Sequence, residues 1–172
     1  YEEVEHLFTD SAEVIFNGGI FKGRKNGIRR LFCNHFRPGL TGKRMEPAPG
    51  FQLNSEQQQD MVEVSPDRTF AKAAFTYSIQ AGAPIVSDSS LVQMARLQGE
   101  GVRKWWEGGV YALSCIKNAE EDTWKIKRLE YRTLVRADYR PGRIHAKPIT
   151  IEHFSKVSPH DPAGPDRLVS QA

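Results

Sequence analysis

Residues 105–111 read WWEGGVY and lie inside a longer stretch, RKWWEGGVYALSCIK at 103–117, whose composition predicts a β-strand. Strand interiors favour aromatic and β-branched residues and disfavour glycine. A carboxylate and two glycines placed between tryptophan and tyrosine therefore need a reason. Either the sheet bends at Gly108-Gly109, or something approaches the backbone closely there, as it would at a binding site.

A second long strand, predicted at 123–136, shows a change in its pattern. Apolar residues first occupy even-numbered positions from Trp124 and then odd-numbered positions from Leu129. A shift of one residue in a period-two pattern is the expected trace of a β-bulge, which also bends the strand. We place this bulge near Lys127-Arg128, so the sequence predicts a curved sheet.

The earlier part of the chain alternates between helical and strand patterns. The last turns of a helix are predicted at 2–9, and a second helix at 25–39 ends at Pro38-Gly39. Between them, Asn17-Gly18-Gly19 supplies the positive-φ residues of a tight hairpin turn. A loop at 38–50, strand pieces at 51–54 and 60–65, a turn at 66–68, a strand at 69–79 and a lid-like insertion at 81–103 complete the prediction.

Strands and helices are thus segregated along the sequence, which predicts an α+β fold and not a doubly wound one. A bent antiparallel sheet has a concave face, and helices packed on that face leave a pocket at its wide end.

The composition limits the classes of function. The chain has 172 residues, 39% hydrophobic, with a formal net charge of +3 and scattered Lys and Arg. Nucleic-acid binding needs a concentrated basic surface, so no nucleic-acid partner is predicted. No apolar run approaches the roughly 20 residues of a membrane span, so no membrane partner is predicted either.

Few residues have the chemistry or spacing of a metal or redox site. Cys33 and Cys115 are the two cysteines, and they show neither a disulfide framework nor a zinc-site spacing. The histidines have no ligand spacing, and Gly99 and Gly101 lack the strand and helix of a phosphate loop. We therefore predict no metal, no cofactor and, by default, a cytoplasmic protein.

Three patches together resemble a known family. LFTDSAEVIFNGGIFKGRKNGIRRLF at 7–32, WWEGGVY at 105–111, and WKIKRLEY at 124–131 followed by ADYRPG are similar in order and spacing to SnoaL-like domains of the nuclear transport factor 2-like superfamily. The resemblance implies one domain over 1–145, with its first helix truncated at the N-terminus, and a partly disordered extension at 146–172. It also implies a cone-shaped, strongly curved antiparallel sheet packed on helices around a hydrophobic pocket.

The same resemblance implies an activity but does not supply its residues. Relatives include polyketide cyclases, steroid isomerases and dehydratases such as scytalone dehydratase, which move a proton beside a carbonyl in an apolar cavity. The isomerase base and a dehydratase tyrosine both match Phe16, and two dehydratase histidines match Asn54 and Ala73. Those catalytic positions are therefore substituted here.

Glu107 is the local candidate for an acid or base, with Tyr111 on the same strand face as a hydrogen-bond donor. The alternative is that Glu107 lies on the solvent face, as most strand carboxylates do. His35 falls on the apolar stripe of its helix, where it is either a second proton-transfer group or a satisfied core histidine. The predicted pocket lining is Phe16, Phe32, Asn54, Phe75, Tyr77, Trp105, Trp106 and Tyr131.

These residues leave two functions open. The first is a cofactor-independent lyase or isomerase, dehydratase- or cyclase-like, acting on a small apolar carbonyl or hydroxy compound. The second is a non-catalytic domain that binds an apolar ligand or dimerises. In either case the resemblance implies a homodimer formed through the sheet.

Overall fold

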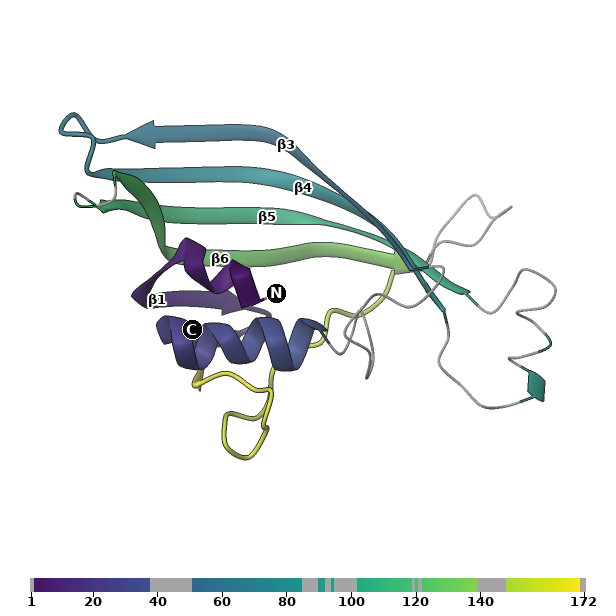
Figure 1. Cartoon of the computed structure of the whole chain (residues 1–172). Helices are drawn as coiled ribbons and strands as arrows, with labels where there is room; N and C mark the ends of the chain where they lie inside the picture. Colours follow the sequence, from purple (N-terminus) through teal and green to yellow (C-terminus); the bar gives the residue numbers. More distant parts are fainter. Residues whose placement is uncertain are drawn as a thin grey trace.

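A computed structural model describes residues 2–37, 51–84, 90–91, 94, 102–118, 120, 122–138 and 148–170. A 3₁₀ turn at the start is followed by a hairpin, a helical segment, four long strands and a short terminal strand (Figure 1). In order, the elements are η1 (Glu2–Leu7), β1 (Phe8–Phe16), β2 (Gly19–Lys22), η2 (Gly23–Ile28), η3 (Arg30–Phe36), β3 (Gln52–Val64), β4 (Phe70–Pro84), β5 (Val102–Asn118), β6 (Thr123–Asp138) and β7 (Arg167–Leu168). The helical segment is continuous, because Arg29 between η2 and η3 keeps helical dihedrals, φ −58° and ψ −42°.

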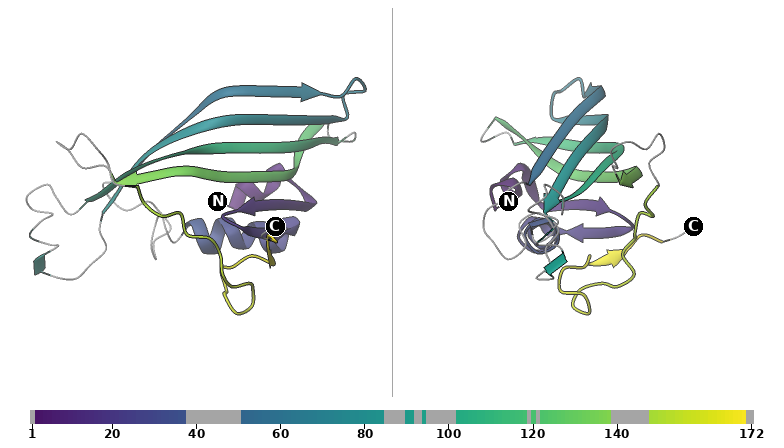
Figure 2. Two further views of the ribbon diagram at one scale, coloured as in Figure 1. Left: turned by 180° about the vertical axis from the view of Figure 1, so that it is seen from behind. Right: turned by 90° about the vertical axis from the view of Figure 1, so that its right-hand side faces the viewer.

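All seven strands form one strongly curved sheet in the order β3-β4-β5-β6-β1-β2-β7 (Figures 1 and 2). The predicted α+β class and the curved sheet packed on a helix are confirmed. One feature differs from the expected antiparallel sheet, because β1 pairs with β6 in parallel. The sheet is therefore mixed. This pairing joins segments more than a hundred residues apart, which no local sequence pattern reports.

Two bulges on β6 interrupt its pairing with β5. The register shifts at Ser114/Cys115, where Lys127 is the extra residue, which confirms the bulge predicted near Lys127-Arg128. It shifts again at Gly108/Gly109, where Leu134 is the extra residue. Each bulge adds twist and bends the strand, and the second lies directly opposite the glycine pair of WWEGGVY.

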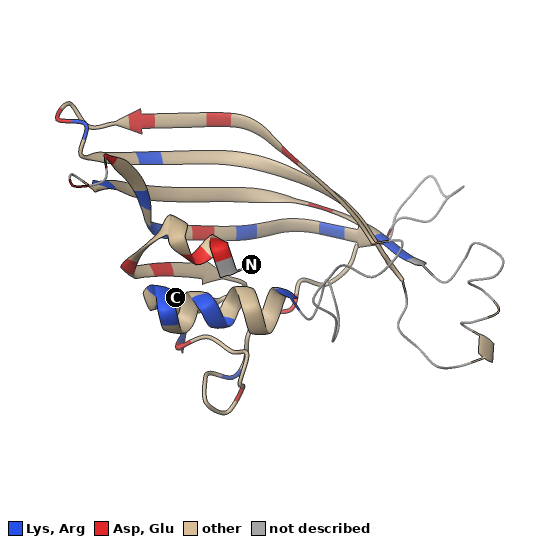
Figure 3. Cartoon of the chain, viewed as in Figure 1, with Lys and Arg blue, Asp and Glu red and all other residues tan. Residues whose placement is uncertain are grey.

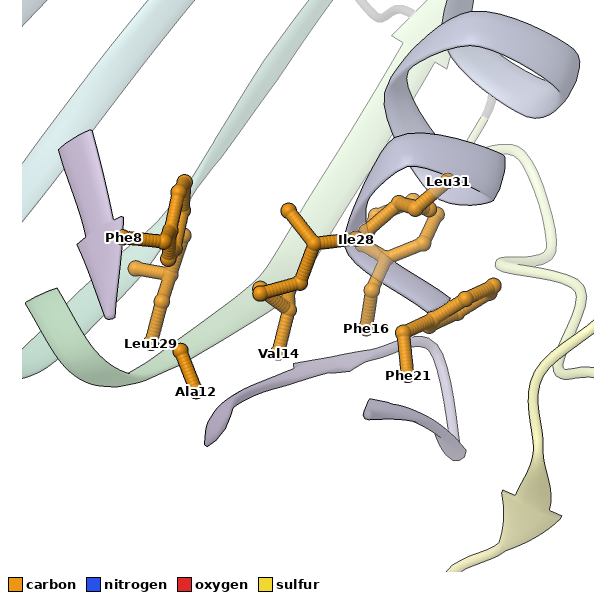
Figure 4. Packing of buried hydrophobic residues seen from close by; sticks show 8 residues of the cluster. All are labelled: Phe8, Ala12, Val14, Phe16, Phe21, Ile28, Leu31 and Leu129. Atoms are coloured by element: carbon orange, nitrogen blue, oxygen red, sulfur yellow. The ribbon is translucent and has the colours of Figure 1, made fainter. Parts of the chain in front are cut away.

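The core lies where the β1–β2 hairpin packs on the helix. The predicted turn is present, with φ of 44° at Asn17 and 76° at Gly18. Side chains from the hairpin, the helix and β6 point into one cluster (Figure 4). Its buried members are Phe8, Ala12, Val14, Phe16, Phe21, Ile28, Leu31 and Leu129.

Strands β3 and β4 are longer than the sequence pattern predicted. The two expected pieces at 51–54 and 60–65 are one strand, irregular between Gln58 and Met61, where Gln59 has a φ of 47°. The strand predicted at 69–79 continues to Pro84. The loop at 38–50 and most of the insertion predicted at 81–103 lie outside the described residues.

Residues 153–169 pack against the β1–β2 hairpin, although their composition suggested a poorly ordered tail. β7 pairs with β2, and Pro165 is fully buried. Asp166 accepts hydrogen bonds from the Lys22 amide at 2.7 Å and from Arg30 Nη2 at 2.6 Å. These partners are distant in sequence, so composition alone does not reveal them. The division of the chain near residue 145 stays a prediction.

Candidate functional site

The described residues enclose a cavity of about 810 Å³ on the inner side of the sheet. Its walls come from the end of β1, from η3, from β3, β4, β5 and β6, and from residues 149–152 of the C-terminal segment. Aromatic rings of Phe16, Phe32 and Phe36 line one end. A cavity of this size and aromatic character suits a small organic ligand.

Glu107 lies in the wall of this cavity and is only 9% exposed. Its Oε1 accepts hydrogen bonds from the hydroxyl of Tyr131 and, at 3.3 Å, from that of Tyr77. Its Oε2 lies 3.7 Å from Nε of Arg136, the residue that faces Glu107 across the β5–β6 ladder. Of the two orientations that the sequence left open, the structure therefore shows the inward one.

The glycines of WWEGGVY make room for this arrangement. A Cβ on Gly109 would lie 2.1 Å from the Arg132 carbonyl oxygen and 2.7 Å from the Tyr77 hydroxyl. The Tyr77 ring therefore lies over the backbone of Gly109, which has no side chain, and reaches Glu107. The Leu134 bulge lies on β6, the strand that pairs with the other edge of β5. Both explanations offered for the glycine pair hold: the sheet bends there, and a side chain approaches the backbone closely.

Three tyrosines form a cluster around the carboxylate. The ring centroid of Tyr111 lies 4.6 Å from that of Tyr131 and 4.8 Å from that of Tyr77. Burial is the main reason that the pKa of each hydroxyl is raised, and the nearby charge of Glu107 raises the pKa of Tyr131 further. The hydroxyls therefore stay protonated at neutral pH and act as hydrogen-bond donors.

His35 faces the same cavity from η3. Its ring centroid lies 5.8 Å from Phe16, 5.5 Å from Phe36 and 5.1 Å from Phe154. Burial among these rings lowers the pKa of His35, and the charge of Asp161 opposes that shift. A neutral imidazole at physiological pH can accept a proton, which is what a base in this position would need.

The predicted pocket residues divide into three groups. Phe16, Phe32, Trp105 and Tyr131 line the cavity, together with the three catalytic candidates Glu107, His35 and Tyr111. Tyr77 pairs with Gly109, so it lies on the same face of the sheet as Glu107, to which its hydroxyl donates. The Phe75 ring packs on that of Tyr111, with ring centroids 5.0 Å apart.

Asn54 and Trp106 are corrections, because neither lines the cavity. Asn54 is exposed on β3 and hydrogen-bonds to Glu56 at 3.1 Å, whereas its neighbour Leu53 lines the cavity. Trp106 alternates with the inward residues Trp105 and Glu107 along β5. In both places the strand alternation turns the predicted side chain away.

Sequence analysis missed Arg136, Thr133 and residues 149–152. Counting by two from Tyr131 reaches Thr133 and then Val135, but the bulge at Leu134 changes the phase and brings Arg136 inward. Residues 149–152 reach the cavity because the Ile149 amide donates to the Arg136 carbonyl at 2.7 Å. A change of phase in the polar–apolar alternation would have predicted the inward position of Arg136. The alternation does not show this change, because Leu134 and Val135 are both apolar.

The described residues include no group of three or more His, Cys, Asp or Glu side chains that could hold a metal ion. Within the same residues, no helix is long and apolar enough to cross a bilayer. The cytoplasmic location stays a prediction.

The open, strongly curved sheet wrapped on a helix is a fold that this chain shares with solved structures. No protein-family model matches the sequence, and no curated protein matches it. Solved structures do match, at identities that show the fold alone. A "Putative Scytalone Dehydratase" from Novosphingobium aromaticivorans has a TM-score of 0.53 at 15% identity, over 91% of this chain and 80% of that one.

Two further structures have the same fold. LinA matches with a TM-score of 0.51 at 13% identity, over 90% of this chain and 80% of its own. A type 2 hexachlorocyclohexane dehydrochlorinase (LinA) matches with a TM-score of 0.50 at 14% identity, over 91% and 80%. The resemblance to SnoaL-like domains drawn from the sequence is confirmed at the level of the fold.

Proposed function

We propose that this protein is a cofactor-independent lyase or isomerase, dehydratase- or cyclase-like, acting on a small apolar carbonyl or hydroxy compound. The observation that carries the proposal is the Glu107 carboxylate, which is buried in the wall of an aromatic cavity and faces donors on two sides. Proton transfer beside a carbonyl needs a positioned acid or base and a donor for the oxygen that gains negative charge.

The residues present could divide this work. Glu107 or His35 would remove the proton from the carbon beside the carbonyl, since both line the cavity. A tyrosine hydroxyl, kept protonated by burial, would donate to the carbonyl oxygen as it becomes an oxyanion. In a dehydration, the group that took the proton would return it to the departing hydroxyl. Support also comes from the fold relatives, which carry the names of a dehydratase and a dehydrochlorinase.

The alternative is a non-catalytic domain that binds an apolar ligand or dimerises. Phe16 and Ala73 favour it, because neither can move a proton at a position where the family resemblance implies a base. The engagement of Glu107 by two tyrosines also fits a purely structural carboxylate. We keep the homodimer through the sheet as part of either proposal, and a monomer in light scattering would contradict it.

Solvent-deuterium exchange tests the catalytic proposal without requiring the natural substrate to be known. The protein is incubated in D₂O with a panel of polyketide-like and steroid-like ketones, and exchange beside the carbonyl is followed by NMR. We expect catalysed exchange that Glu107→Gln lowers by at least about 100-fold, the usual size of a general acid–base contribution. The matched control is Glu56→Gln on exposed β3.

Four results decide between the assignments. Exchange that is lost in Glu107→Gln and kept in Glu56→Gln supports Glu107. Exchange that is lost only in His35→Gln moves the role to His35. Catalysed exchange whose rate is unchanged in both Glu107→Gln and His35→Gln overturns both assignments. No catalysed exchange with any ketone, while these compounds bind, supports the non-catalytic domain.

A further inference from the structure

Arg136 enters the cavity wall with a guanidinium that is only partly paired. Its Nε is buried without a hydrogen-bond partner, and the 3.7 Å to Glu107 Oε2 is too long for a hydrogen bond. Its guanidinium carbon lies 5.5 Å from the centre of the Trp105 ring. A guanidinium has five N–H donors in a planar fork. Trp105 thus covers one face of the guanidinium, and Glu107 lies near its Nε edge. The guanidinium keeps N–H donors for a further acceptor.

The cavity has two chemically different ends. Phe32 and Phe36 of η3 line the cavity with hydrocarbon near Tyr131, five residues before Arg136 on β6. At the other end, where β5 begins and β6 approaches its last residue, Arg136 and Arg103 both line the wall. Arg103 Nε lies 3.4 Å from Asp138 Oδ1, in an exposed pair that leaves it weakly held. A ligand that fills this space would be apolar at one end and polar at the other.

We infer that Arg136 binds a carboxylate group of the ligand, with the apolar body of the ligand lying toward Phe32 and Phe36. The inference rests on the proposed function of the cavity and narrows its substrates to carbonyl or hydroxy compounds that also carry a carboxylate. A guanidinium fork and a carboxylate match in geometry, and charge-assisted hydrogen bonds are roughly twice as strong as neutral ones.

Besides Asp138, which pairs with Arg103, two further carboxylates lie near this end, and neither fills the role. Glu107 accepts hydrogen bonds from Tyr77 and Tyr131, and these donors offset its charge on the side away from the arginine. Glu152 lines the cavity but is exposed, so solvent screens its effect. A ligand carboxylate would therefore meet open donors of Arg136 without displacing an existing hydrogen bond.

Isothermal titration calorimetry with 2-naphthoate and 2-naphthamide tests this inference. The two probes share an aromatic body, and only the first carries a charge. We expect wild-type protein to bind the acid at least about tenfold more tightly than the amide, which corresponds to about 1.4 kcal/mol. Arg136→Gln should bind both probes alike. The control Arg132→Gln, on the same strand but exposed and paired with Glu130, should keep the full preference.

The outcomes separate this inference from the proposed function. Equal binding of the two probes, no binding of either, or a preference that survives Arg136→Gln overturns the inference, while ketone exchange that depends on Glu107 would still stand. A preference lost in Arg136→Gln without any ketone exchange would leave an anion-binding pocket without catalysis. If Arg136→Gln does not fold, Arg136→Lys serves instead: it keeps the charge, loses the fork, and should bind the acid several-fold more weakly.

Discussion

The two lateral edges of the sheet are built differently: β1, β2 and β7 form the hairpin end, and β3 forms the opposite end. At the hairpin end, the helix and the C-terminal segment pack against the sheet, and Phe21 and Leu31 are completely buried (Figures 1 and 2). At the other end every residue of β3 is exposed, Met61 to 69%. β3 also carries three acidic residues and no Lys or Arg (Figure 3). Stability should therefore reside at the hairpin end.

The cavity lies between these two ends. One wall comes from the packed helix and β1, and the facing wall comes from β4 and β5, which extend beyond the helix. The packed helix and β1 hold the side chains of one wall in place, and β4 and β5 leave space for a ligand where they extend beyond the helix. Glu107 and its partners Tyr77 and Tyr131 lie on β5, β4 and β6, and of these strands β6 contributes Leu129 to the buried core.

The largest expected effect comes from the buried end. Phe21→Ala removes a ring that is completely buried and packs on Phe154 at 5.5 Å. Loss of such a ring lowers the free energy of unfolding by about 3–5 kcal/mol. Met61→Ala at the exposed end should change it by less than about 0.5 kcal/mol. Urea unfolding followed by tryptophan fluorescence measures both, and equal effects would contradict the contrast between the two ends.

A smaller effect is expected at Gly109 of β5, a strand that lies between the two ends in the order of the sheet. Gly109→Ala would place a Cβ 2.1 Å from the Arg132 carbonyl oxygen, which backbone movement must relieve. Overpacking of this kind costs about 1–3 kcal/mol. The matched control is Gly108→Ala, whose nearest contact would be Val135 Cγ1 at 3.4 Å.

Gly108→Ala should be neutral or stabilising by up to about 1 kcal/mol, because alanine lowers the entropy of the unfolded chain. The same unfolding experiment compares the two variants. Equal costs at both glycines would mean that the close contacts of Arg132 and Tyr77 are not what requires Gly109.

Local sequence signals predicted the parts of the fold that local physics decides. Asn17-Gly18-Gly19 specified its turn because few residues other than glycine and asparagine adopt positive φ. The bulge at Lys127 showed in the alternation of polar and apolar residues. The bulge at Leu134 did not, since Leu134 and Val135 are both apolar and both exposed. The orientation of Arg136 follows from that second bulge and was missed with it.

Long-range contacts decided the rest of the fold and the site. The parallel pairing of β1 with β6 and the anchoring of Asp166 by Arg30 join distant segments that no short pattern links. Glu107 was a candidate from the sequence, but its buried hydrogen bonds include one from Tyr77 on the adjacent strand β4, 30 residues away. Glu107 and His35 were therefore predictable as candidates, whereas their geometry and the inward position of Arg136 were not.

The smallest expected effect is a pH dependence of stability caused by His35, which sits where the packed end meets the cavity. Burial lowers the pKa of His35 in the native state below its usual value of 6.5, so the unfolded chain binds the proton more readily. The contribution of His35 to stability is then fully present above about pH 7 and falls as the pH drops through 6.5 toward the native pKa. His35→Gln should flatten the profile of unfolding free energy in this range. Asp161→Asn should steepen it, because Asp161 opposes the shift and asparagine keeps the Oδ1 that accepts from the Ala163 amide. Urea unfolding at closely spaced pH values measures all three proteins, and identical slopes would show that the aromatic packing around His35 does not disfavour its charge.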